Sequence, residues 1–168
     1  MEFLARLEQS GFSTWVREST SVWAYPTVLF LHTLGLGFLV GASMLIDLRL
    51  LGFSTELPIA PLKKFFPVMW FGFWVNASSG IVLVMIDATK MLVNPLFYIK
   101  IAFIALAMIS GRLIARLVFA DANADKAALR FNARALAGAS LFFWVCAITA
   151  GRLTAYLFAN PSVSASLH

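Results

Sequence analysis

Charged residues are scarce in this sequence: they make up 12% of its 168 residues, whereas apolar residues make up 61%. Soluble domains carry roughly a quarter charged and about half apolar residues. The surplus of apolar side chains has no place in a single water-soluble core of a chain this long. We therefore expect one domain whose apolar surface faces a lipid bilayer.

Cysteine and histidine are nearly absent as well. Cys146 is the single cysteine, which excludes an intrachain disulfide and a cysteine-based zinc site. His32 and His168 are the two histidines, and the sequence has no HExxH motif, phosphate loop or nucleophile–histidine–acid set, which argues against a hydrolase. The net charge of +5 does not indicate nucleic acid, because the basic residues stand at the ends of apolar runs.

Four long apolar stretches are present, and they predict transmembrane α-helices because about 20 apolar residues cross the hydrocarbon as a helix. They cover residues 22–51, 65–88, 95–120 and 135–159. No ten-residue alternation typical of membrane strands occurs. The connecting segments are short, which favours antiparallel neighbours. The sequence therefore predicts an all-α integral membrane protein, a four-helix up-down bundle over residues 22–159.

The ends of the chain and its basic residues predict an orientation. Residues 1–21 mix large apolar with polar side chains and predict a short helix in the membrane interface, and residues 160–168 form a C-terminal tail. Lys and Arg concentrate in cytoplasmic loops. Most of the 13 Lys and Arg residues lie around the first and third loops, namely Arg49, Lys63, Lys64, Arg112, Arg116, Lys126, Arg130 and Arg134. We therefore expect both termini in the periplasm of a bacterial inner membrane.

Burying a polar side chain in hydrocarbon costs free energy. Polar side chains inside the predicted spans are therefore expected to have a hydrogen-bonding or ionic partner, or a function. At the inner end, Asp47 can form a structural ion pair with Arg112 or Arg116. In the outer half, Asp87 can pair with Lys100 or Arg152, and His32 can form a hydrogen bond to a neighbouring helix. This is the structural interpretation of both groups.

The functional interpretation of the outer group is a b-type haem site. His32 would ligate the iron, and Gly35 would let the macrocycle approach the helix backbone. Lys100 and Arg152 would hold the propionates. The protein would then transfer electrons in the membrane, with a redox partner protein or a quinone.

The second axial position of such a haem is open, because His32 is the only histidine inside the spans. It would be empty, or filled by Met85, by Met108, or by His32 of a second protomer. Gly37 and Gly41 form a GxxxG pattern, which permits close helix contact within the bundle or between protomers. A homo-oligomer is therefore expected.

Three strings carry a resemblance to a known group of proteins. They are HTLGLGFLVGASMLIDLRLLG at residues 32–52, SGIVLVMIDATKMLVNPLFYIKI at 79–101 and AGRLTAYL at 150–157. The sequence resembles an uncharacterised family of four-helix bacterial inner-membrane proteins that is distantly similar to CopD-like and cytochrome b-like proteins. The resemblance implies a four-helix membrane fold. In that family a further histidine often follows the third span, where this chain has Arg112 to Arg116 without one, which argues against two histidine ligands from one chain.

Two other functions remain open. A small transporter or metal-uptake component would line a path with His32, Asn76 and Asp87, although the methionines are scattered and form no copper-binding cluster. A structural or accessory subunit of a membrane complex would use the apolar helix faces for contact with other chains.

Overall fold

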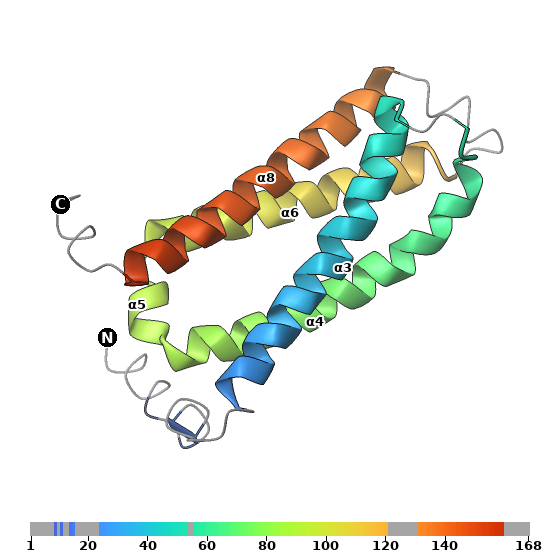
Figure 1. Cartoon of the computed structure of the whole chain (residues 1–168). Coiled ribbons are helices and arrows are strands. Elements are labelled where there is room, and N and C mark those ends of the chain that lie inside the picture. The colour runs from blue at the N-terminus through green and yellow to red at the C-terminus, as the bar shows by residue number, and fades with distance from the viewer. Residues whose placement is uncertain are drawn as a thin grey trace. The chain divides into compact units, whose positions relative to one another are not determined.

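The computed structural model describes residues 24–53, 56–120 and 131–159, with four isolated positions before residue 24. The interfacial helix predicted for residues 1–21 and the tail at 160–168 lie outside these ranges apart from those four positions. Every regular element that the structure describes is helical (Figure 1). In chain order these are α3 (Tyr25–Leu51), the 3-10 helix η1 (Ala60–Lys64), α4 (Phe65–Ile86), α5 (Ala88–Met91), α6 (Pro95–Leu117) and α8 (Phe131–Ala159).

Four helical segments are long and apolar enough to cross a membrane, namely Tyr25–Leu51, Ala60–Ile86, Pro95–Leu117 and Phe131–Tyr156. At most 33% of the most apolar window of each is buried inside the chain. Large side chains such as Phe30, Phe71 and Trp74 are 60–66% exposed. Soluble proteins rarely expose apolar surface on this scale. The four predicted apolar helices are confirmed, and they indicate a multi-pass membrane protein.

Local sequence signals explain where the helices begin and end. The Asn94 side chain accepts a hydrogen bond from the Leu96 amide at 2.9 Å and Pro95 opens α6, so this helix begins at residue 95, as predicted for the third span. Gly52 follows α3 with a φ of 107°, and the Phe53 amide donates to the Leu48 carbonyl at 3.0 Å, which closes the helix end.

Helix α8 begins at Phe131, four residues before the predicted start at residue 135. The charged residues before the apolar run made this segment resemble a loop. Arg134 explains the extension, because its side chain donates to the carbonyl oxygens of Leu50 and Leu51 at 3.4 Å and so satisfies the last carbonyls of α3.

The chain folds as two compact units, and helix α3 contributes to both. The first unit comprises Met1–Ser43 and Lys64–Val93. In it α3 and α4 run antiparallel: Gly35 lies against Asn76, and Leu39 lies against Gly72. A Cβ on Gly35 would meet the Asn76 backbone nitrogen at 2.6 Å, and one on Gly72 would meet the Leu39 nitrogen at 2.5 Å. Two glycines therefore bring the backbones of α3 and α4 into direct contact.

The second unit comprises Met44–Lys63 and Asn94–His168. Here α6 and α8 lie side by side and antiparallel (Figure 1). Lys100 near the start of α6 contacts Gly151 near the end of α8, and the rings of Phe103 and Phe143 lie 6.2 Å apart between centroids. The last turns of α3 pack against the beginning of α8.

Gly35→Ala or Gly72→Ala will weaken the α3–α4 contact, because the added methyl group meets backbone that has no rotamer by which to move away. Overpacking of this kind costs about 1–3 kcal/mol. The measurement is the free energy of unfolding of the purified protein in mixed detergent or bicelles.

Gly37→Ala and Gly41→Ala are the matched controls, because a Cβ at either position meets nothing within 4 Å. We expect them to leave the unfolding free energy unchanged. Equal losses at all four glycines would contradict this packing.

Candidate functional site

His32 lies at the crossing of α3 and α4 in the first unit, half-buried beside two buried polar residues of α4, Asn76 and Ser79. Its Nδ1 atom lies 3.0 Å from the Asn76 carbonyl oxygen and 3.2 Å from the Ser79 hydroxyl oxygen. The Asn76 side-chain amide donates to the His32 carbonyl oxygen at 2.8 Å. Side chains of both helices thus bind backbone of the other helix at the same level.

The partners of Nδ1 determine which ring nitrogen carries the proton. A carbonyl oxygen only accepts hydrogen bonds, so the 3.0 Å contact to Asn76 is a hydrogen bond when Nδ1 carries the proton, whereas the Asn76 side-chain amide at 3.4 Å would donate to an unprotonated Nδ1. The Ser79 hydroxyl lies 2.6 Å from the Val75 carbonyl oxygen, to which it donates, and this leaves its oxygen as a second acceptor for Nδ1–H. In the neutral tautomer with its proton on Nδ1, the lone pair lies on Nε2. A histidine arranged in this way presents Nε2 as the atom that can bind a metal.

Glycines fix the position of the ring. A Cβ on Gly80 would lie 3.2 Å from His32 Cε1 and 3.5 Å from Nδ1, so the imidazole occupies the space that this glycine leaves. Gly35 has a different neighbour from the one that the haem hypothesis assigns to it. The α4 backbone at Asn76 occupies the side where its Cβ would point, so Gly35 serves helix packing in this structure.

The predicted propionate partners belong to the second unit. Lys100 is half-buried with its side chain along Gly151, and Arg152, the next residue of α8, is exposed. The two methionines proposed as axial ligands belong to different units: Met85 is half-buried in α4, and Met108 is 8% exposed in α6. The structure thus brings Lys100 and Gly151–Arg152 together and places His32 with Asn76 and Ser79.

The residues of the predicted ion pairs make other contacts in the structure. Asp47 is 1% exposed and accepts a hydrogen bond from the Ser140 hydroxyl of α8 at 2.7 Å. Arg112 and Arg116 of α6 are exposed, and their pairing with Asp47 stays a prediction. Asp87 follows the last residue of α4 and its carboxylate lies 4.0 Å from the Lys90 ammonium, with side chains 40% and 67% exposed. A pair this exposed adds little stability.

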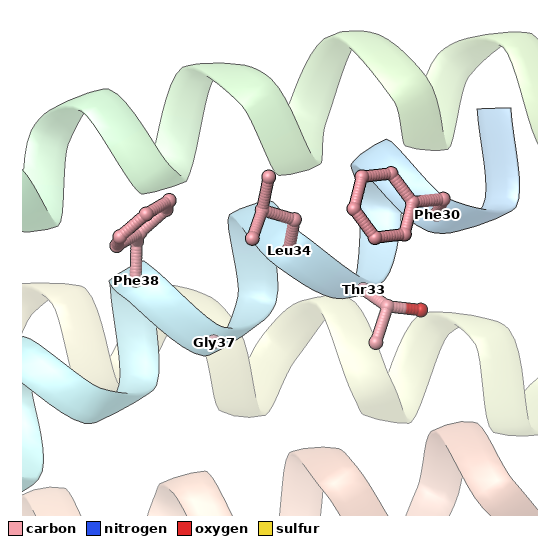
Figure 2. Close-up of a pocket in the computed structure, with 5 residues that line it drawn as sticks. All are labelled: Phe30, Thr33, Leu34, Gly37 and Phe38. Carbon is pink, nitrogen blue, oxygen red and sulfur yellow. The ribbon is translucent and has the colours of Figure 1, made fainter. Parts of the chain in front are cut away.

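The GxxxG glycines lie on another side of α3. At about 100° per residue, Gly37 and Gly41 lie roughly 140–180° around the helix from His32. Figure 2 shows an open groove on this side, where Phe30, Leu34 and Phe38 project from α3 along with Thr33 and Gly37. The GxxxG pattern therefore makes no close helix contact within the described part of the first unit. Two copies packed through this groove would hold their His32 rings apart.

Some residues of these contacts were not identified from the sequence. Ser140 forms the buried partner of Asp47, and Gly72 makes the closest approach to α3. Both could have been found from the spacing of small and polar residues. Gly72, Asn76 and Ser79 lie at helical spacing in α4, and Ala133, Ala137 and Ser140 do so in α8. Stripes of small residues with a polar member indicate contact faces in membrane helices.

The chemistry of the site is that of one imidazole. Among the described residues, no group of three or more His, Cys, Asp or Glu side chains is arranged to hold a metal ion. A metal at His32 would therefore need most of its ligands from elsewhere, as a macrocycle supplies them. In comparisons with known proteins, no family model, no curated protein and no solved structure matches this chain.

Two adjacent serines test whether the histidine contact stabilises the helix pair. Ser79→Ala removes an acceptor of His32 Nδ1–H, and we expect a loss of about 0.5–1.5 kcal/mol, the usual range for hydrogen bonds between membrane helices. Ser78→Ala is the control, because that hydroxyl is exposed and donates only within α4, to the Trp74 and Val75 carbonyls. The measurement is the unfolding free energy of both variants, and equal values would show that Ser79 adds nothing across the helices.

Proposed function

We propose that this protein binds a b-type haem through Nε2 of His32 and takes part in electron transfer in the bacterial inner membrane. The single observation that supports the proposal is the hydrogen bond from His32 Nδ1 to the Asn76 carbonyl oxygen. It orients the ring, and in the tautomer with its proton on Nδ1 the lone pair for an iron lies on Nε2. Ligating histidines almost always have such a partner on their other nitrogen.

The residues present fit one axial ligand of a haem. The ring lies in the space above Gly80, and the Asn76 carbonyl, the Asn76 amide and the Ser79 hydroxyl lie on its Nδ1 side. Hydrogen bonding to Nδ1 raises the basicity of Nε2 and thereby tunes a bound iron. A haem would supply one-electron redox chemistry, which the side chains of the site lack. Lys100 and Arg152 stay predicted partners of its propionates.

The second axial ligand also stays a prediction. At about 1.5 Å per residue, Met85 lies roughly 8 Å farther along α4 than Gly80, which faces the ring. The groove of Figure 2 lies on the other side of α3, so a second protomer would contribute its His32 only through a different face. We favour an iron with His32 as its single protein ligand from this unit.

The proposal includes the order of the four spans, the N-terminal helix and the location of the termini. The antiparallel contacts of α3 with α4, and of α6 with α8, support the up-down order of four spans. We further propose an interfacial helix over residues 1–21 and a periplasmic location of both termini, on the basis of the Lys and Arg distribution.

The absorption spectrum of the protein purified from haem-supplemented cells tests the function. We expect a Soret band that is lost in His32→Ala, because the iron then has no imidazole from α3. His168→Ala is the matched control, because it removes the other histidine of the chain and should leave the band unchanged.

A colourless, iron-free protein would contradict the proposal, as would a full Soret band in His32→Ala. Met85→Leu and Met108→Leu complete the set. A spin-state change in either variant would identify a thioether as the second ligand.

A further inference from the structure

Two cations lie at one end of the second unit. Lys100 extends its side chain over Gly151: a Cβ at that glycine would meet Lys100 Cε at 3.4 Å and Nζ at 3.6 Å. The next residue of α8 is Arg152, which is exposed. Lys100 Nζ lies beside Gly151, and Arg152 is the next residue along α8. The two positive charges are therefore at the same end of the α6–α8 pair.

No carboxylate compensates these charges within the described part of this unit. Neither Lys100 nor Arg152 makes a hydrogen bond or ion pair with any described residue. Asp47 binds Ser140, which lies about 18 Å from Arg152 along α8 at roughly 1.5 Å per residue. Glu56 follows α3, whose last carbonyls contact Arg134 near the opposite end of α8.

The surroundings place the two cations at the level of lipid headgroups. Tyr98 and Tyr156 flank them on α6 and α8 and are 56% and 54% exposed. Tyrosines and basic residues concentrate where membrane helices meet the interface. Lys100 lies within the first turns of α6 with its methylene chain against α8, so its ammonium can reach the headgroup layer while the chain stays in apolar surroundings.

We infer that Lys100 and Arg152 bind the phosphate of an anionic phospholipid. The bilayer supplies phosphate at this depth, and two cations without an acidic partner favour a headgroup with a net negative charge over a zwitterionic one. A basic residue near an anionic membrane surface contributes about 1 kcal/mol. A haem propionate shares the oxyanion chemistry, but the inference does not depend on haem.

The test is an NMR titration of the full chain in neutral detergent micelles, with the Gly151 amide as the local reporter. Short-chain phosphatidylglycerol should shift this amide and saturate, whereas short-chain phosphatidylcholine, inorganic phosphate and propionate should shift it little. The Gly138 amide of α8 is the internal reference. Lys100→Gln with Arg152→Gln should weaken the phosphatidylglycerol response about 30-fold, which corresponds to roughly 1 kcal/mol per cation.

Two charge variants complete the design. Lys100→Arg with Arg152→Lys keeps both charges and should keep the response. Arg112→Gln with Arg116→Gln removes two exposed cations near the other end of α6 and should leave the Gly151 response unchanged. Equal responses to the two lipids, an equal response to phosphate or propionate, or an unchanged response in the double glutamine variant would each overturn the inference.

Discussion

The hydrogen bond between His32 Nδ1 and the Asn76 carbonyl oxygen exists because a polar group in lipid has to find its partner inside the protein. Water is absent from the bilayer core, so an unsatisfied donor or acceptor costs several kcal/mol. In the part of the chain that the structure describes, every buried side-chain nitrogen and oxygen has a hydrogen-bond partner. His32, Asn76 and Ser79 meet this requirement by binding one another and the backbone between them.

This requirement depends on how closely the helices approach. Asn76 reaches the His32 carbonyl because Gly35 and Gly72 let the two backbones touch, and the ring fits where Gly80 has no side chain. Tight packing is what drives association of membrane helices, since lipid is as apolar as a leucine side chain. The glycines and the polar residues therefore depend on each other: the close approach brings the polar groups into reach, and their bonds hold the crossing in one register.

The second unit satisfies its buried polar groups with different side chains from those of the first unit. In the second unit, the buried Asp47 carboxylate accepts from Ser140, while Arg134 satisfies carbonyls at the end of α3. Lys100 and Arg152 lie toward the ends of their helices, and lipid headgroups are the counter-charge that we propose for them. The second unit thus satisfies its buried polar groups by hydrogen bonds between helices that include charged side chains.

The four helices could be predicted from the sequence because the length of an apolar stretch depends on that segment alone. The ends of α6 at Asn94–Pro95 and of α3 near Gly52 were equally local signals. Partners between helices could not be predicted in this way. Ser140 has many possible neighbours in a bundle, and Gly35 looked available to a macrocycle until α4 was found against it. The GxxxG pattern left its partner open for the same reason, since spacing shows which residues share a face but not what that face meets, and contact between protomers stays a prediction.

The most direct measurement is the nitrogen-15 NMR spectrum of the His32 ring in bilayers, with selectively labelled histidine and His32→Ala to assign the signals. We expect a ring that carries a proton on Nδ1 and a coupling from that proton to the Asn76 carbonyl. A ring without a proton on Nδ1 would contradict the arrangement on which both the helix contact and the proposed ligand role depend.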